Sequence, residues 1–274
     1  MKSLAPYLFS AFCFLVYFSQ NSYCQKNNRL MESILLESKF ENENAFSQWS
    51  LEVCRKDAIT VSKVVSRKGK YSLRFEFSKS DPLQYNGYVR AELKQDFKTD
   101  ETGENWYGFS HYLPKDFVAD PVPEVIAQWH EIPDKQLGED WRSPPISLEI
   151  KNDHYFIKVL WASNPVNTNR TKDGELFYDL GPVDKSKWTD WVFHIKFRYD
   201  STGILEVWKN KEKVLFREGP NSYNDQRFPY FKVGIYKWGW AGGGKRSPES
   251  TRILYFDEIR VGDRNANLQT VSPF

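Results

Sequence analysis

Short stretches of alternating apolar and polar residues recur along the chain, and they most constrain its fold. In residues 71–77 four apolar side chains alternate with three polar ones, and residues 191–198 repeat the pattern. A period of two is typical of β-strands with one buried face. Gly, Pro, Asn and Asp interrupt these stretches, and no long amphipathic helix is evident. From about Ile34 to Val261, the sequence therefore predicts many short strands.

The chain is expected to form one domain. Its 274 residues contain no linker-like low-complexity stretch and no internal repeat. We therefore expect an all-β fold, a single β-jelly-roll sandwich of two antiparallel sheets with a concave groove. Aromatic residues make up 16% of the chain, and such residues favour strands. Aromatic rings also line carbohydrate sites, because the apolar face of a sugar packs on a flat ring, but most of these rings are expected in the core.

The first 24 residues have the features of a secretory signal peptide. Lys2 gives a positive start, residues 4–18 are largely apolar, and residues 22–24 form a small-x-small cleavage pattern. The apolar stretch is short for a membrane span, and no later stretch of the sequence is suited to one. We therefore expect residues 1–24 to be removed and residues 25–274 to form a secreted or periplasmic domain.

The cysteines agree with this interpretation. Cys13 and Cys24 lie in the leader, so the mature chain would keep Cys54 alone, with no intramolecular disulfide and no cysteine metal site. We expect Cys54 to be a buried structural residue. Acylation of Cys24, as in a lipoprotein, is a less favoured alternative because bulky Tyr23 precedes it.

Three predicted strands each combine an apolar face with a polar face suited to catalysis. They lie in residues 88–94, 125–130 and 230–236. Their polar side chains are Tyr88, Arg90, Glu92, Lys94, Gln128, His130, Lys232 and Tyr236. Side chains two apart on a strand share a face, so each set points in one direction. Gly234 is expected to leave room for a ligand. Taken singly, each signal also fits a solvated strand face or a structural His or Tyr.

Together these residue types suit β-elimination at a uronic acid. The C5 proton becomes removable when the adjacent carboxylate is neutralised, and Arg90 and Gln128 are suitable donors for that carboxylate. His130 and Tyr236 are the candidates for the base and the acid. Lys232 would lower the pKa of the tyrosine or bind a carboxylate or sulfate. No cofactor is required for this chemistry.

The stereochemistry of the sugar divides these roles. In glucuronate or mannuronate the C5 proton and O4 lie on the same side, so one tyrosine would serve as base and then as acid. In iduronate or guluronate they lie on opposite sides, so His130 would be the base and Tyr236 the acid. The sequence leaves both arrangements open.

The three segments resemble motifs of known polysaccharide lyases. Residues 90–94 resemble the R-S-E-L-R motif of jelly-roll alginate lyases, residues 128–130 their Q-I/V-H motif, and residues 230–236 their Y-F-K-A-G-x-Y motif. Residues 188–194 and 203–208 are closer to the heparin lyase I and glucuronan lyase group. The resemblance spans roughly Leu36 to Val261.

The resemblance implies roles and a substrate class. Arg90 and Gln128 would neutralise the carboxylate, His130 would be base or stabiliser, and Tyr236 would be the acid. Lys94, Trp129 and the Lys237-Trp238 pair depart from the alginate lyase pattern. We therefore expect a glucuronate- or iduronate-containing chain, such as glucuronan, ulvan or a heparin-like chain, rather than alginate.

Further residues are expected around the site. The predicted substrate-binding residues are Lys232, Glu92, Tyr88, Trp238, Lys245, Arg246 and His194. Asp257 and Glu41 are candidates for a structural Ca²⁺ site, since calcium prefers oxygen ligands, although a solvated acid pair is at least as well supported.

The expected partner is an anionic polysaccharide. The net charge of +2 and the absence of basic runs argue against nucleic acid, no membrane span is expected, and the protein is predicted to be monomeric. A non-catalytic carbohydrate-binding module on the same fold, or an alginate lyase, is the alternative. A glycoside hydrolase ranks last because no second carboxylate is an obvious partner for Glu92.

Overall fold

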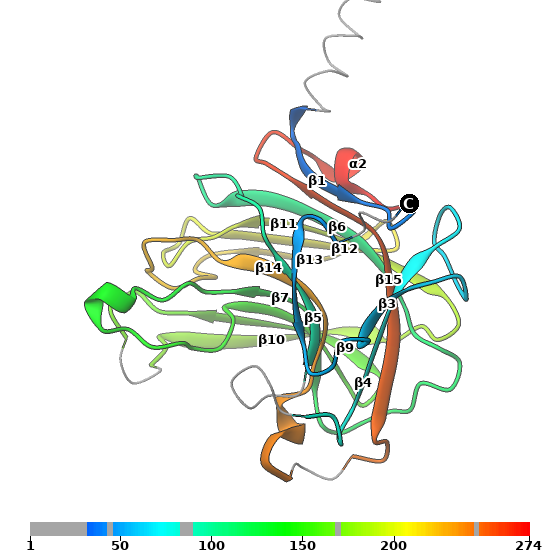
Figure 1. Cartoon of the computed structure of the whole chain (residues 1–274). Helices are drawn as coiled ribbons and strands as arrows, with labels where there is room; N and C mark the ends of the chain where they lie inside the picture. Colours follow the sequence, from blue (N-terminus) through cyan, green and yellow to red (C-terminus); the bar gives the residue numbers. More distant parts are fainter. Residues whose placement is uncertain (1–31, 43–45, 83–89, 168–170, 244–246) are drawn as a thin grey trace, which may run out of the picture.

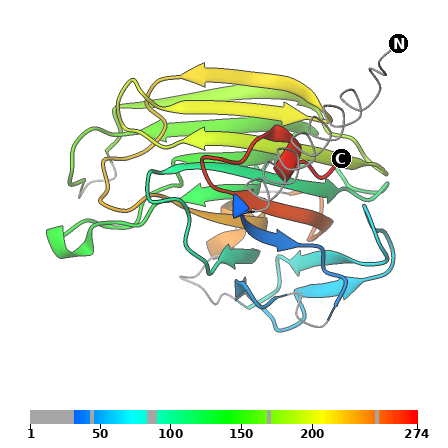
Figure 2. The same cartoon turned by 90° about the horizontal axis from the view of Figure 1, so that it is seen from above.

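The computed structural model describes residues 32–42, 46–82, 90–167, 171–243 and 247–274. There the chain forms two antiparallel sheets that pack face to face (Figure 1 and Figure 2). The predicted all-β jelly-roll sandwich is confirmed. The predicted leader, residues 1–24, lies outside the described residues and stays a prediction.

One sheet has eight strands. These are β1 (Ile34–Ser38), β3 (Ile59–Ser62), β4 (Ser72–Ser78), β6 (Glu104–Tyr112), β11 (Trp188–Lys196), β12 (Ile204–Lys209), β13 (Glu212–Glu218) and β15 (Thr251–Gly262). Their order is β13-β12-β11-β6-β15-β4-β3, and β1 pairs with β15. Neighbours are often far apart in sequence because the chain crosses repeatedly between the two sheets.

The other sheet has seven strands and carries the candidate site. These are β2 (Trp49–Val53), β5 (Arg90–Gln95), β7 (Glu124–His130), β8 (Ile146–Lys151), β9 (His154–Trp161), β10 (Gly174–Pro182) and β14 (Tyr230–Tyr236). Their order is β10-β9-β8-β7-β14-β5-β2. The described helical segments are short: η2 (Lys135–Leu137), η3 (Trp238–Gly243) and α2 (Leu268–Val271), which lies beside the C-terminus (Figure 1).

The core lies between the two sheets and is rich in aromatic rings. Trp129 of β7 stands with its ring centroid 5.3 Å from that of Phe231 on β14 and 4.7 Å from that of Phe193 on β11. These rings therefore join the two layers. Because successive side chains of a strand point to opposite faces, burial of Trp129 and Phe231 turns Gln128, His130 and Lys232 to the outer face of the seven-stranded sheet.

The environment of Cys54 and the lengths of the helices bear on two further predictions from the sequence. Cys54 is buried, as predicted, and forms no disulfide within the part of the chain that the structure describes; its Sγ accepts a hydrogen bond from the backbone N of Arg90 at 3.2 Å. Within the described ranges, the helices are all too short or too polar to cross a membrane.

Candidate active site

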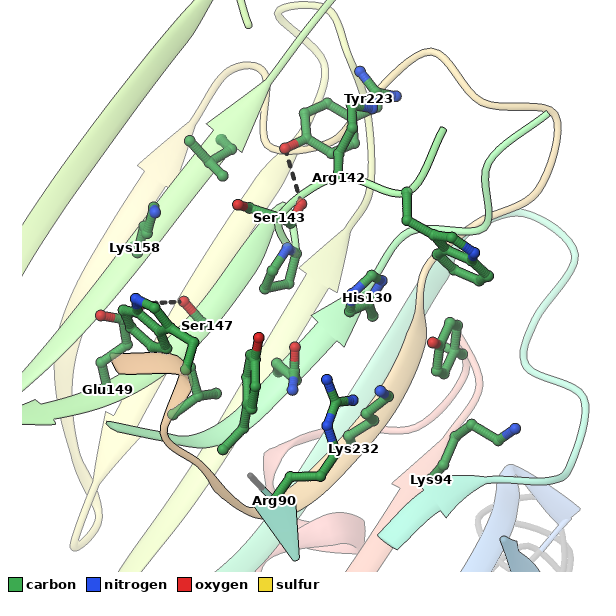
Figure 3. Close-up of a pocket in the computed structure, with 18 of the residues that line it drawn as sticks. Arg90, Lys94, His130, Arg142, Ser143, Ser147, Glu149, Lys158, Tyr223 and Lys232 are labelled. Atoms are coloured by element: carbon green, nitrogen blue, oxygen red, sulfur yellow. Dashed lines mark hydrogen bonds between the residues drawn. The ribbon is translucent and has the colours of Figure 1, made fainter. Parts of the chain in front are cut away.

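A groove of about 590 Å³ lies on the outer face of the seven-stranded sheet. Its lining residues are Glu52, Arg90, Lys94, Val125, Gln128, His130, Trp141, Arg142, Ser143, Pro144, Ser147, Glu149, Lys158, Leu160, Lys172, Glu175, Tyr223, Tyr230, Lys232, Tyr236 and Trp238. The four predicted catalytic residues are therefore brought together, and predicted Lys232 and Trp238 lie with them. Figure 3 shows Arg90, Lys232 and His130 on neighbouring strands of the floor.

Strand register explains why polar residues distant in sequence meet in this floor. Lys232 pairs with Lys94 on one side and with Gln128 on the other. Gln128 in turn pairs with Ser147, and Ser147 pairs with Lys158. Directly paired residues of neighbouring strands point to the same face. One row of polar side chains therefore runs across five strands, from β5 to β9.

Two cations in the floor share one carboxylate. Oε2 of Glu52, on β2, lies 2.8 Å from an Nη atom of Arg90 and 2.8 Å from Nζ of Lys232. Burial alone would raise the pKa of Glu52, but attraction to Lys232 and Arg90 outweighs burial and holds this pKa below its ordinary value. Glu52 is therefore ionised and keeps both cations charged and in place. We did not predict Glu52 from the sequence.

Glu92 lies beneath the floor. Its side chain is 1% exposed, and it is not among the residues that line the groove. We predicted that it binds substrate, but the structure instead places it against other side chains: it accepts a hydrogen bond from the amide of Gln128 and lies 3.5 Å from Arg90. An amide nitrogen has two donors, so Glu92 fixes the orientation of Gln128 and leaves one N–H for a ligand.

His130 stands at the end of β7 between two aromatic rings. Its ring centroid is 5.7 Å from that of Tyr230, in a stacked arrangement, and 5.6 Å from that of Trp141, which meets it edge-on. Its Nδ1 lies 2.6 Å from Oε2 of Glu131, a carboxylate with no exposed surface. The imidazole is therefore held on three sides while its side chain remains 17% exposed in the groove.

Tyr236 ends β14 beside Arg90. The guanidinium carbon of Arg90 lies 4.3 Å from the centroid of the tyrosine ring, and the ring of Trp238 lies 5.9 Å away. Gly234 has a different role from the predicted one. Its φ is +140°, and a Cβ there would lie 2.2 Å from the backbone O of Ala91. The glycine is thus required by close backbone packing within the sheet, not by space for a ligand.

The part of the groove over β8 and β9 carries balanced charge. Ser147 donates to Glu149 at 2.8 Å, and burial raises the pKa of Glu149 above its ordinary value. Lys158 lies 3.3 Å from Glu175, which also pairs with Lys172. Figure 3 shows Ser147, Glu149 and Lys158 to one side of the Arg90–Lys232 pair. This end of the floor therefore offers hydrogen bonds with little net positive charge.

Loops around Arg142 form one wall. The Arg142 guanidinium lies 3.6 Å from the centroid of the Tyr223 ring and bonds to Glu139 at 2.9 Å and Asp225 at 2.8 Å. Burial raises the pKa of Asp225 to about 7, and nearby Glu139 acts in the same direction, against the attraction of Arg142. A second hollow adjoins this wall and shares Lys94, Trp141 and Tyr230 with the groove.

The model of a polysaccharide lyase family matches residues 38–260, which is most of the chain. The chain belongs to this polysaccharide lyase family. No curated protein sequence matches the lyase. The resemblance to jelly-roll polysaccharide lyases that the sequence motifs predicted is confirmed.

Solved structures similar to the lyase share its fold. An endo-β-1,4-glucuronan lyase from the fungus Trichoderma reesei has a TM-score of 0.71 and 22% identity, over 87% of this chain and 98% of that one. The alginate lyase Aly36B has a TM-score of 0.52 and 11% identity, over 86% and 98%. A GH131 β-glucanase catalytic domain from Podospora anserina has 0.51 and 10%, over 82% and 88%. At these identities the likeness concerns the fold alone.

His194 does not belong to the groove of the lyase, so its predicted substrate contact is wrong. It lies on β11 of the other sheet, and the flanking Phe193 and Ile195 are core residues, which turns His194 to the outer face of that sheet. Its Nδ1 and Nε2 lie 2.7 Å from Glu206 and 2.9 Å from Glu104. The polar strand face was correctly identified, but it is a face of the opposite sheet.

Asp257 and Glu41 hold the two ends of one loop. Asp257 accepts from the backbone N of Arg67 at 2.7 Å, and Glu41 accepts from that of Lys70 at 2.9 Å. Burial raises the pKa of Asp257 to about 6. The described residues contain no group of three His, Cys, Asp or Glu side chains arranged for a metal. These carboxylates face N–H donors, so they are not a prearranged oxygen cage, and a calcium site here stays a prediction.

Three predicted substrate-binding residues, Tyr88, Lys245 and Arg246, lie outside the described residues and stay predictions. The structure adds two carboxylates that the sequence did not indicate, Glu52 and Glu131. Glu52 alternates with apolar residues on a short strand, which is a weak signal. The significance of Glu131 depends on the turn after β7, which the sequence pattern did not specify.

Proposed function

We propose that this lyase cleaves a glucuronate- or iduronate-type polysaccharide by β-elimination and leaves a 4,5-unsaturated uronyl end. One observation carries the proposal: the donors Arg90, Lys232 and Gln128 share a groove floor with His130 and Tyr236. The first three suit a carboxylate, and the last two are able to exchange protons. A non-catalytic binding module has no need of both sets at one place.

The chemistry follows from these positions. Arg90 and the second N–H of Gln128 bind the uronate carboxylate and stabilise the charge that develops there. A base removes the C5 proton, the electron pair of that bond becomes the C4–C5 double bond, and the C4–O4 bond breaks. An acid protonates O4. His130 and Tyr236 supply these roles, with tyrosine alone sufficient where the proton and O4 lie on the same side.

The charges of the lining support a chain that carries carboxylates and few sulfates. Among the described residues, Lys94 is the one cation of the lining without a carboxylate within 4 Å. The others are already paired, for example Arg90 and Lys232 with Glu52. Densely sulfated chains need many unpaired cations, whereas one carboxylate at the Arg90–Lys232 pair replaces an existing partner.

We also propose that the protein acts outside the cytoplasm. Residues 1–24 have signal-peptide features, and large anionic glycans are met outside the cell. We expect the mature protein to be secreted or periplasmic and to bind an anionic polysaccharide as a monomer. N-terminal sequencing of the exported protein tests the cleavage site, and a start at Gln25 is expected.

The test is an ultraviolet assay of unsaturated uronyl product with glucuronan, ulvan, heparin, heparan sulfate, hyaluronan and alginate. We expect absorbance to rise with a glucuronate- or iduronate-containing chain and to be abolished by His130→Ala or Tyr236→Phe. New reducing ends without absorbance would indicate hydrolysis and overturn the proposal. Binding without either signal would indicate a carbohydrate-binding module.

A further inference from the structure

The carboxylate of Glu131 is buried directly behind His130. It has no exposed surface, and its Oε2 lies 2.6 Å from Nδ1 of His130. Its Oε1 accepts a hydrogen bond from the backbone N of Arg142 at 2.5 Å. Oε2 has no aligned hydrogen bond among the described residues, so the imidazole is the group that this oxygen approaches. The Glu131 side chain therefore links the imidazole to the wall of the groove.

Both neighbours of Nδ1 accept hydrogen bonds and donate none. The aligned bond joins Nδ1 to the backbone O of Glu131 at 3.2 Å, and the closer contact is the 2.6 Å approach to the carboxylate. Neither oxygen has a proton to give when Glu131 is ionised, so in the neutral imidazole Nδ1 carries the hydrogen. The lone pair then belongs to Nε2, the ring nitrogen that is able to accept a proton.

The buried carboxylate of Glu131 is also placed to stabilise a positive charge on the imidazole during the reaction. A carboxylate without exposed surface is costly unless a positive group lies beside it. The guanidinium of Arg142 bonds to Glu139 and Asp225, so within the described ranges the one hydrogen bond that Arg142 gives to Glu131 comes from its backbone N–H. An imidazolium at His130 would be the closest full positive charge to Oε2. Proton transfer to Nε2 therefore relieves an unfavourable burial of charge.

We propose that Glu131 is a positioning residue that fixes the Nδ1–H tautomer of His130 and stabilises the imidazolium formed when Nε2 takes the C5 proton. This deepens the proposed function and rests on it. On an iduronate unit, where the C5 proton and O4 lie on opposite sides, His130 is then the base: the C5–H electron pair forms the C4–C5 double bond, the C4–O4 bond breaks, and O4 takes a proton from Tyr236. Exchange with water returns both side chains to their starting protonation states.

The test compares Glu131→Gln with Glu139→Gln. Glu139 is a matched control because it is also buried in this wall and bonds to Arg142, without a contact to His130. With an iduronate-containing chain as substrate, Glu131→Gln is expected to lower kcat about 10- to 100-fold with little change in KM. It should also move the acid limb of the kcat/KM profile to lower pH, because the imidazolium loses its counter-charge. Glu131→Asp should restore part of the rate, and Glu139→Gln should leave the profile in place.

A purely structural role for Glu131 would lower thermal stability without moving the acid limb, and that outcome overturns the inference. Equal effects of Glu131→Gln and Glu139→Gln would overturn it as well. If Glu131→Gln fails to fold, ¹⁵N NMR of the wild-type imidazole decides: a hydrogen on Nε2 in the neutral ring would contradict the assignment. This NMR readout needs no turnover, so it separates failure of the inference from failure of the elimination proposal, in which the wild type forms no unsaturated product.

Discussion

Glu52 and Glu92 bind the same two cations but differ in where they stand. Glu52 lines the groove, whereas Glu92 lies beneath it and also holds the amide of Gln128. A substrate carboxylate that approaches Arg90 and Lys232 therefore competes with Glu52 and not with Glu92. Glu52 therefore holds the two cations in place until a substrate carboxylate binds, and Glu92 orients the hydrogen-bond donors around them.

Substitution of these carboxylates should separate the two roles. Glu52→Gln is expected to lower KM for the polysaccharide by about 3- to 10-fold, because the substrate no longer displaces a carboxylate. Glu92→Gln is expected to lower kcat about 10-fold or more, because Gln128 loses its charged anchor. Steady-state kinetics on the preferred glycan measures both. Equal losses of kcat in the two variants would contradict this division.

At the scale of the element, β14 depends on one glycine. Gly234→Ala would force a side chain into a φ of +140° and place Cβ 2.2 Å from the backbone O of Ala91. We expect a loss of about 2–4 kcal/mol in the free energy of unfolding, with loss of activity because Lys232 and Tyr236 flank this position. Gly138→Ala is the control: its φ is +85°, and no atom lies within 4 Å of the added Cβ. For Gly138→Ala, denaturant unfolding should show a loss of about 1 kcal/mol in the free energy of unfolding. Similar losses in the two variants would argue against close packing at β14.

The wall around Arg142 should respond to pH through Asp225. The pKa of this group is raised from 3.8 to about 7 in the folded protein, so between about pH 4 and pH 7 the folded state binds more protons than the unfolded state. The contribution of Asp225 to stability is therefore lost as pH rises through this window.

Removing the titration of Asp225 should cancel this loss. Relative to the wild type, Asp225→Asn is expected to gain on the order of 1 kcal/mol between pH 5 and pH 8, about 2–4 °C in Tm for a chain of this size. Asp140→Asn, whose carboxylate is 76% exposed, is the control. Calorimetry at the two pH values measures the difference, and a parallel decline of Asp225→Asn and wild type would count against the assignment.

At the scale of the whole molecule, strand periodicity predicted which face of a strand each side chain takes, but not which sheet the strand joins. Arg90, Gln128 and Lys232 were placed correctly because alternation with buried residues is a local property. His194 shows the same alternation, yet β11 belongs to the other sheet. Glu52 was not predicted as a site residue, because no local sequence pattern indicates that β2 pairs with β5. Long-range contacts decide which distant strands pair, and the local alternation of residues does not indicate those contacts.

The pairing of charges over the whole groove predicts how efficiently the lyase cleaves sulfated chains. Most cations of the lining already have carboxylate partners, and Lys94 is the described exception. We expect kcat/KM for heparin to be at least about 10-fold below that for glucuronan, because buried or paired cations give little to an added sulfate.

Lys94→Ala should raise KM for glucuronan and weaken the salt dependence of kcat/KM, because it removes the least neutralised charge. Initial rates at equal uronate concentration in low and moderate salt measure both effects. A preference for heparin that falls steeply with salt would mean that the groove presents more free positive charge than these pairs allow.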